Sequence, residues 1–343
     1  MTIFLLLKIL MIMTIPSLLS NLIFVFGLEP NSIISTLGHY NLITGNIKDE
    51  YSFNDYEIVK NNIEECKGEI VIYIHGIWRN TAYALEEAER IQLVLQQNNY
   101  LIPFVVYLWN SNTALPSVID STGGWESAVK ISNGNGKSLA KYILDFKNQC
   151  PSDNVRIIAH SLGSRVIFSA LENLQHNLSW NNQNYTLNSV HLLGAAIDYN
   201  QPSKNPTDCI VNQNSLNCSG VVIQDEVESF YNLFNPQDNM LQYGYTLAEG
   251  GDVPLGLNGI NENVDIDNIP DNYNEKNVKY EIPLFPDVDR NWIFDCFEIG
   301  FQGSNHCGYM GARSGYINTH FHDFIINDGA IDIVLENWRD NNN

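Results

Sequence analysis

A serine in the middle of the chain stands where a predicted strand turns abruptly into a predicted helix. The largely apolar run 155–159 stops at 159–163 (Ala-His-Ser-Leu-Gly), and from position 162 onwards apolar residues recur every three or four positions. That recurrence is the period of one buried helix face. A serine on so sharp a turn exposes its hydroxyl, as in the G-x-S-x-G arrangement of nucleophilic serines, here with Ala159 at the first small position. The simpler interpretation is a helix with Ser161 as its N-cap.

A nucleophilic serine needs a base within hydrogen-bond reach and a group that orients the base. In hydrolases with this turn, the acid and then the histidine follow the serine along the chain. We favour His306 as the base because it lies in a loop before the last predicted helix, with His320 and His322 as alternatives. We favour Asp238 as the acid over Asp198, because Asp238 follows the later of two predicted strands. Two further histidines lie away from that edge or inside a strand: His176 and His191.

An anion that develops on the substrate needs N–H donors. The sequence His75-Gly76-Ile77 directly follows a buried strand predicted over 69–74. A glycine there lets the backbone turn and present the Ile77 N–H, and the Leu162 N–H supplies the second donor. A His-Gly pair alone is a weak signal, but it is more specific upstream of a serine turn.

The rest of the chain must position these residues, and its pattern is an alternation of strands and helices. Such alternation implies a parallel sheet covered on both faces, in an α/β fold. Ligands of such sheets bind beyond the carboxyl ends of the strands, where the candidate residues lie. We expect strands over 32–43, 69–74, 102–108, 155–159, 190–194 and 227–234. We expect helices that begin at 81 and at 162, a helix between 125 and 146, and a last helix over 330–338. The helix between 125 and 146 should kink or break at 133–136.

Two segments interrupt this alternation, at about 199–225 and 239–305, and we interpret them as insertions that could form a lid over the active-site edge. Loops of this length are functional or disordered. The acidic residues of the second segment could hold calcium, but the spacing of an EF-hand loop is absent. We therefore predict no metal site and no cofactor. The acidic residues in question are Asp265, Asp267, Asp271, Asp287 and Asp289.

The N-terminal segment 1–27 is strongly apolar, and we interpret it as a secretory signal peptide or a membrane anchor. The domain 28–343 would then be exported. Six cysteines without a Cys-x-x-Cys pair predict disulfides in an oxidising compartment. Three Asn-x-Ser/Thr triplets, at Asn177, Asn184 and Asn217, are candidate glycosylation sites.

Composition limits the partners of the chain. With 343 residues, 44% of them hydrophobic, the chain can bury a large core. The formal net charge of −21 argues against nucleic acid as a partner, because a phosphate backbone requires a basic face. The same charge argues against electrostatic adhesion to anionic lipid, so any membrane association would depend on the N-terminal segment.

Together, the His75-Gly76 turn, the segment 158–164, Asp238 and His306 resemble the α/β-hydrolase superfamily. They are most similar to lipase- and esterase-like members with Ala-His-Ser-x-Gly turns. The resemblance implies an α/β-hydrolase fold, with a mostly parallel central sheet, helices on both faces and loop insertions at the active-site edge. It also implies a role for each candidate residue: Ser161 as nucleophile, His306 as base, Asp238 as acid, and Ile77 and Leu162 as oxyanion-hole amides.

The strand order of that family also implies a pairing of the cysteines. It places the strand before the oxyanion turn beside the nucleophile strand, so that residues just before both strands share one edge. A Cys66–Cys150 disulfide is therefore expected. Two further pairs would be Cys209–Cys218, closing a small loop, and Cys296–Cys307, holding the segment that carries His306.

These features predict a secreted or membrane-anchored serine hydrolase that cleaves a small-molecule or lipid ester through an acyl-enzyme on Ser161. Apolar residues near the site favour an apolar substrate: Ile77, Trp78, Trp109 and Trp125. Acyltransferases and peptidases use the same set of residues, and fold alone does not separate them. A different class also remains open, namely a non-catalytic surface protein that keeps the fold and binds partners through its acidic insertions.

Overall fold

The structure is a computed structural model, and it describes residues 30–63, 65–114, 124–209, 217–282, 305–314 and 324–340. Several predictions concern residues outside these ranges: the N-terminal segment 1–27, Asp287, Asp289, Cys296, His320 and His322. Within the described ranges, no helix is both long enough and apolar enough to span a membrane.

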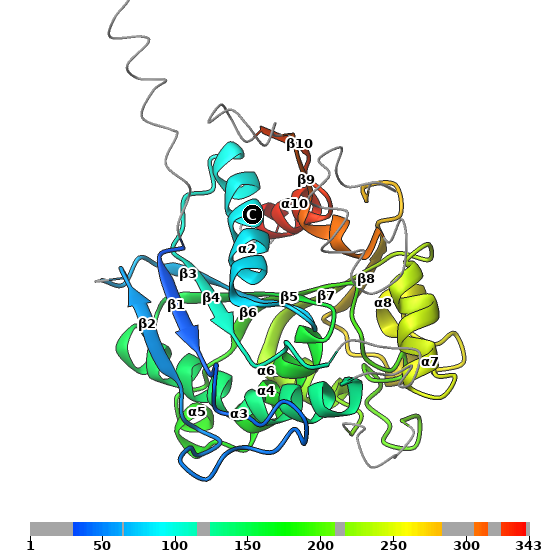
Figure 1. The fold of residues 1–343 in the computed structure, drawn as a ribbon, viewed down its shortest axis with the longest axis horizontal. Coiled ribbons are helices and arrows are strands. Elements are labelled where there is room, and N and C mark those ends of the chain that lie inside the picture. The colour runs from blue at the N-terminus through cyan, green and yellow to red at the C-terminus, as the bar shows by residue number, and fades with distance from the viewer. Residues whose placement is uncertain are drawn as a thin grey trace, which may run out of the picture.

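One eight-stranded sheet forms the centre of the molecule, in the order β2-β1-β4-β3-β5-β6-β7-β8 (Figure 1). All neighbouring strands are parallel except β1 and β2. The strands are β1 (Ser32–Ser35), β2 (Glu57–Asn61), β3 (Glu69–Ile74), β4 (Phe104–Leu108), β5 (Asn154–His160), β6 (Leu187–Leu193), β7 (Val227–Phe234) and β8 (Tyr273–Asn277). A separate two-stranded sheet pairs β9 (Ala312–Ser314) with β10 (Phe324–Asn327). The predicted α/β fold with a mostly parallel sheet is confirmed.

Helices cover both faces of the large sheet (Figure 1). Because side chains alternate along a strand, Ile70, Ile72 and Ile74 of β3 enter one hydrophobic core while Val71 and Tyr73 enter the other. The first core lies under α3, α4 and α6, and the second under α2 and α10. The α-helices are α2 (Thr81–Gln97), α3 (Trp125–Gln149), α4 (Gly163–Gln175), α5 (Leu178–Asn182), α6 (Gly220–Glu226), α7 (Thr246–Ala248), α8 (Leu255–Asn258) and α10 (Ile331–Asp340). The π-helix η1 (Met240–Tyr245) and the 3₁₀ helices η2 (Ile266–Asn268) and η3 (Asn305–Met310) complete the set.

Helix α3 runs without interruption from Trp125 to Gln149, so the expected break at 133–136 is wrong. The glycines of that stretch serve close packing instead. A Cβ atom at Gly136 would lie 2.3 Å from the Ser169 hydroxyl of α4, and one at Gly134 would lie 2.8 Å from the Tyr40 hydroxyl. Tertiary contacts therefore outweigh the low helix propensity of these residues.

Strand β8 was not expected, because it lies inside the segment 239–305 that we interpreted as an insertion. Only its first residue, Tyr273, is buried, and the other four are exposed. An exposed polar edge strand lacks the apolar alternation by which strands are recognised. The first strand, β1, is also shorter than expected, since it covers only Ser32–Ser35 of the predicted 32–43.

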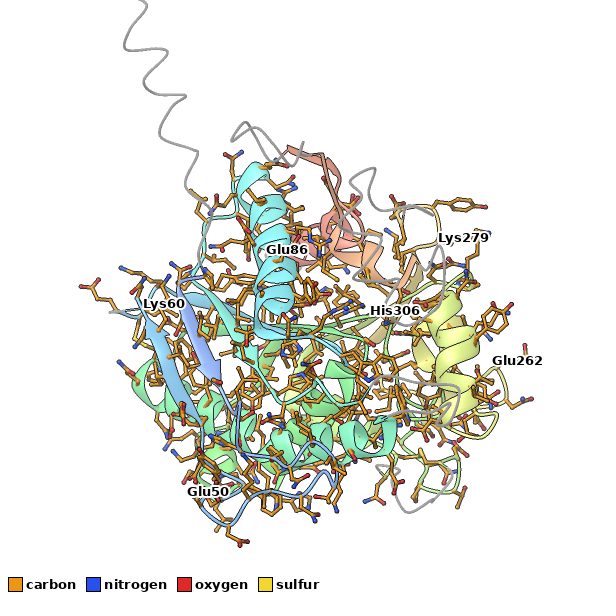
Figure 2. All side chains as sticks on the ribbon, viewed as in Figure 1. Glu50, Lys60, Glu86, Glu262, Lys279 and His306 are labelled. Carbon is orange, nitrogen blue, oxygen red and sulfur yellow. A yellow bond between two sulfur atoms is a disulfide. The ribbon has the colours of Figure 1, made fainter. Side chains whose placement is uncertain are left out.

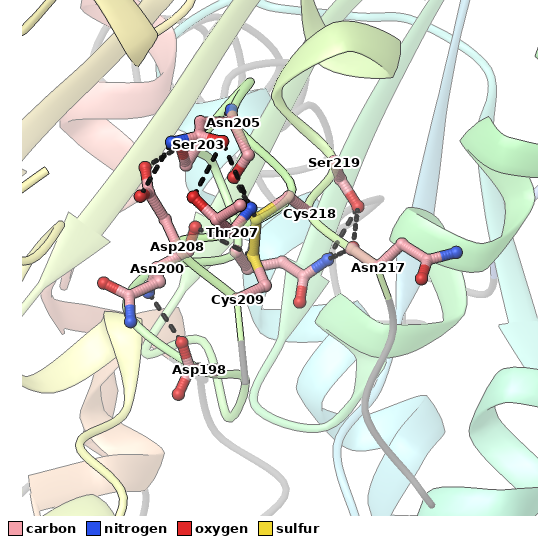
Figure 3. Close-up of a disulfide and its surroundings, with 11 residues drawn as sticks. Asp198, Asn200, Ser203, Asn205, Thr207, Asp208, Cys209, Asn217, Cys218 and Ser219 are labelled. Carbon is pink, nitrogen blue, oxygen red and sulfur yellow. Dashed lines mark hydrogen bonds between the residues drawn. A yellow bond between two sulfur atoms is a disulfide. The ribbon is translucent and has the colours of Figure 1, made fainter. Parts of the chain in front are cut away.

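Two of the three predicted disulfides are present. Cys66 is bonded to Cys150, and Cys209 to Cys218, each with a Cα–Cα distance of 5.5 Å. Figure 3 shows the second bond inside a network of polar side chains that includes Ser203, Asn205 and Asp208. Cys307 is disulfide-bonded as well, and Cys296 lies outside the described residues. Structural disulfides are typical of proteins from oxidising compartments.

Replacing both Cys66 and Cys150 by serine should destabilise the fold by about 4 kcal/mol, because the bond closes a loop with a sequence separation of 84. Urea unfolding of the double variant beside the wild type measures this loss. The matched control is the double replacement of Cys209 and Cys218. Their sequence separation is only 9, so this variant should lose less free energy of unfolding. Equal losses would contradict the chain-entropy explanation.

Candidate active site

Ser161 lies on a left-handed turn between β5 and α4. Its φ angle is 53°, a conformation that costs energy for a residue other than glycine and that clusters at active sites. The backbone around it is fixed: the Ser161 N–H donates to Leu193 O (3.0 Å), and the Ala196 N–H donates to Ser161 O (3.1 Å). Gly163 permits α4 to begin against β3, since a Cβ there would lie 2.7 Å from Ile74 O. The turn therefore presents the serine at the carboxyl edge of the sheet.

The His75-Gly76-Ile77 turn lies directly against this serine. A Cβ atom at Gly76 would be 2.9 Å from Ser161 Cβ and 3.4 Å from its Oγ. Within the described residues, neither the Ile77 N–H nor the Leu162 N–H donates a hydrogen bond. Two such donors, the second at the N-terminus of a helix, are what a developing oxyanion requires.

His75 fixes the direction of one of these donors. Its Nε2 accepts the Trp109 N–H (3.2 Å), so the proton is on Nδ1, which donates to Gly76 O (2.9 Å). Because C=O and N–H of a trans peptide point in opposite directions, this bond also sets the direction of the Ile77 N–H. Burial lowers the pKa of His75 to about 4, which keeps the ring neutral in this role.

The predicted acid and the predicted base are in contact. His306 Nδ1 lies 2.6 Å from Asp238 Oδ2, and both side chains are buried (Figure 2 labels His306). The Tyr309 hydroxyl donates to the same oxygen (3.3 Å), and the Leu241 N–H donates to Oδ1 (3.1 Å). With the carboxylate as acceptor, Nδ1 of His306 carries the proton and Nε2 is left as the basic nitrogen.

The alternatives to this acid and base lie elsewhere. Asp198 accepts the Asn200 N–H (2.8 Å), and burial, the largest cause, raises its pKa. No histidine among the described residues pairs with it. His176 is exposed at the end of α4 and bonds its own helix, and His191 is buried in β6 with its ring stacked on Tyr231.

His160, the residue before Ser161, connects the two halves of the candidate site. Its ring lies 4.8 Å from the His306 ring, and its Nε2 is 3.0 Å from His306 O. Its Nδ1 is 3.2 Å from the position of a Cβ at Gly76. The serine turn, the His-Gly turn and the Asp238–His306 pair are thus gathered around one buried ring at the edge of the sheet.

A buried ion pair beneath this edge was missed by the sequence analysis. Arg79 Nε lies 2.7 Å from Glu87 Oε1, and the Tyr73 hydroxyl donates to Glu87 Oε2 (2.8 Å). Burial, the largest single cause, would raise the pKa of Glu87, but the charges of Arg79, His160 and Arg90 and the hydrogen bond from Tyr73 together outweigh it, and the pKa falls to about 2. Arg79 also reaches Cys307 Sγ (3.1 Å), next to the base. A signal existed: Glu87 falls on the apolar face of α2 that contains Ala84 and Ala88.

Nothing in the described ranges forms a free metal site. The one group of side chains with metal-ligand spacing there is Cys66, Cys150 and Asp153, and its two cysteines are bonded to each other.

Gly76→Ala should lower kcat/KM about 10²-fold, because the added methyl group would displace either Ser161 or the Ile77 amide, and small misplacements in an active site have effects of this size. Steady-state hydrolysis of a soluble ester measures the loss, with the thermal midpoint as a check on folding. A variant as active as the wild type would show that the turn does not adjoin the reacting atoms.

Acid should destabilise the fold partly through its buried histidines. Burial lowers the pKa of His191 to about 3, so the unfolded chain takes up a proton near pH 6.5 that the folded chain does not. Stability contributed by the neutral ring is therefore complete above pH 6.5 and is lost, at about 1.4 kcal/mol per pH unit, as the pH falls towards 3. His191→Leu should lack this loss, so its stability deficit relative to the wild type should shrink with falling pH in urea unfolding. A deficit independent of pH would contradict the prediction.

Fold and site together define the class of this protein as an α/β hydrolase. The chain belongs to the family described as alpha/beta hydrolase of unknown function (DUF900), whose model matches residues 52–249. The match includes Ser161 and Asp238 and ends before His306. A comparison with curated proteins gave no match.

Several solved structures are similar at low identity. The catalytic core domain of acetyl xylan esterase from Trichoderma reesei is 13% identical, with 54% of this chain and 94% of that chain covered and a TM-score of 0.31. A cutinase-like protein from Cryptococcus sp. is 12% identical, with 57% and 73% covered and a TM-score of 0.28. Lipase B of Aspergillus fumigatus is 10% identical, with 70% and 49% covered and a TM-score of 0.32. We draw no conclusion about the reaction from similarities this low.

Proposed function

We propose that this protein is a serine hydrolase that cleaves a carboxylic ester through an acyl-enzyme on Ser161. The observation that carries the proposal is the buried hydrogen bond between His306 and Asp238, at the edge of the sheet where the serine is held on a left-handed turn. The order serine, acid, histidine along the chain is that of α/β hydrolases.

In the proposed reaction, Ser161 Oγ attacks the ester carbonyl while His306 Nε2 takes the hydroxyl proton. The Ile77 and Leu162 N–H groups donate to the oxyanion of the tetrahedral intermediate. His306 then gives the proton to the departing alkoxide, which leaves as the alcohol. Water, deprotonated by the same nitrogen, then attacks the acyl-enzyme. When the bond from the acyl carbon to Ser161 Oγ breaks, His306 returns the proton to Oγ and the acid is released. Asp238 keeps the imidazole in the productive tautomer throughout and stabilises its positive charge.

For the substrate, we propose a small-molecule or lipid ester with an apolar acyl group. Trp78 follows the Ile77 amide and is itself left-handed, with φ 54°. Its ring lies 6.5 Å from the Trp125 ring, which is 5.7 Å from the Tyr245 ring. This aromatic row beside the oxyanion turn favours apolar groups over charged ones.

The disulfides of the protein support a secreted or membrane-anchored location, as proposed for the exported domain.

Hydrolysis of p-nitrophenyl esters from acetyl to palmitoyl tests the reaction and the acyl preference together, with the matching anilides as a test for peptidase activity. We expect ester hydrolysis by the wild type, a preference among chain lengths, and little anilide cleavage. Faster anilide cleavage would point to a peptidase, and no turnover of any ester by the folded protein would contradict the proposed function.

A further inference from the structure

We propose that His160 is a positioning residue, which seats the base by donating its Nε2–H to the backbone carbonyl of His306. The inference rests on the proposed function, because it concerns how His306 reaches Ser161. His160 itself touches no reacting atom in this account. It would act through the 3₁₀ helix η3 (Asn305–Met310), which we call the base loop.

The base loop is short, and a few contacts tie it to the sheet. The Asp238 carboxylate holds the side chains of His306 and Tyr309. Arg79 reaches Cys307 Sγ. The bond from His160 holds the backbone of the base itself, with 3.0 Å between Nε2 and His306 O. Since a rotation of that carbonyl would swing the imidazole, this bond governs the position of Nε2 of the base.

The tautomer of His160 follows from its partners. A carbonyl oxygen only accepts, so the proton must be on Nε2. Nδ1 is then a bare acceptor, and it is buried without a hydrogen-bond partner among the described residues. Burial, the largest cause, and the neighbouring His306 lower the pKa of His160 to about 3, so the ring stays neutral and its donor stays in place over the working pH range.

A buried acceptor without a partner is unfavourable, because it has lost its hydrogen bonds to water. An apolar residue at the end of β5 would avoid that penalty while filling the same space. The position of His160 explains why a histidine stands there. It is the residue before the proposed nucleophile, and its ring faces Gly76 on one side and bonds the base loop on the other. Its backbone is fixed by β5 and its ring by the loop, so the side chain of His160, together with the bond from Asp238, sets the distance between Ser161 and His306.

His191 offers a matched control on the adjacent strand β6. It is also fully buried, and its Nδ1 also lacks a partner among the described residues. Its Nε2, however, lies 3.4 Å from Asn337 of the C-terminal helix rather than near the base loop. Leucine at position 191 should therefore remove a comparable buried imidazole without disturbing the active site.

The test compares His160→Leu, His160→Gln and His191→Leu in the full chain, by steady-state kinetics and by the low-field proton resonance of the Asp238–His306 bond. His160→Leu should lower kcat about 10²-fold with KM nearly unchanged, and should shift or broaden that resonance. His160→Gln should recover most of the rate, because its amide can donate to the same carbonyl. His191→Leu should lower stability and leave kcat and the resonance as in the wild type.

If His160→Leu fails to fold, His160→Asn replaces it, since asparagine is as polar as glutamine but too short to reach the loop. Equal kcat values for His160→Gln and His160→Asn, or a wild-type kcat in His160→Leu, would overturn the inference. These results are distinct from failure of the proposed function, which would appear as a wild-type protein that hydrolyses no ester.

Discussion

Ser161→Ala is expected to lower kcat about 10⁶-fold, which is the effect of removing the nucleophile from a serine hydrolase of this type. The variant loses one oxygen atom while the turn keeps its bonds to Leu193 and Ala196, so substrate binding should persist. Ester hydrolysis under saturating substrate measures the change, and circular dichroism with a thermal scan checks the fold. A folded variant with near wild-type turnover would remove Ser161 from the mechanism.

Asp238→Asn is expected to lower kcat about 10⁴-fold, because a neutral side chain no longer fixes the tautomer of the base. Both carboxylate oxygens of Asp238 accept hydrogen bonds, from His306 and Tyr309 on one and from Leu241 on the other. Asparagine has a single oxygen, so its NH₂ group must face at least one of these donors. The His306 ring would then turn or take the wrong tautomer.

The matched control for this prediction is Asp198→Asn, at the other acid that follows a strand at the same edge. Because Asp198 bonds only its own loop among the described residues, its replacement should leave kcat nearly unchanged. A large loss in Asp198→Asn together with an active Asp238→Asn would exchange the two assignments.

Much of the fold was predictable because its buried strands carry a strong local signal. The strands 69–74 and 227–234 were predicted with the bounds that the structure shows. The first is a nearly continuous apolar run, and the second mixes apolar and polar residues and ends at the turn residues Asn235 and Pro236. The Cys66–Cys150 pairing followed from the strand order that the resemblance to α/β hydrolases implied, rather than from the cysteines themselves.

What the sequence did not reveal depends on contacts between distant residues. The polar edge strand β8 is recognisable only by its pairing with β7. The continuity of α3 depends on close contacts with Tyr40 and Ser169, which no local propensity contains. The bond from His160 to the base loop joins residues 146 positions apart. Local patterns therefore placed Ser161 on its turn, whereas the contacts that hold His306 and Asp238 required the three-dimensional structure.

The most direct measurement is a peptide map of the wild-type protein after reaction with a fluorophosphonate, a probe that phosphonylates activated serines. We predict one adduct, on the peptide that contains Ser161, and none in Ser161→Ala treated in parallel. Labelling should also be far slower in Asp238→Asn. An adduct on another serine, or ester hydrolysis that persists in a protein the probe does not modify, would contradict the assignment of Ser161 as the nucleophile.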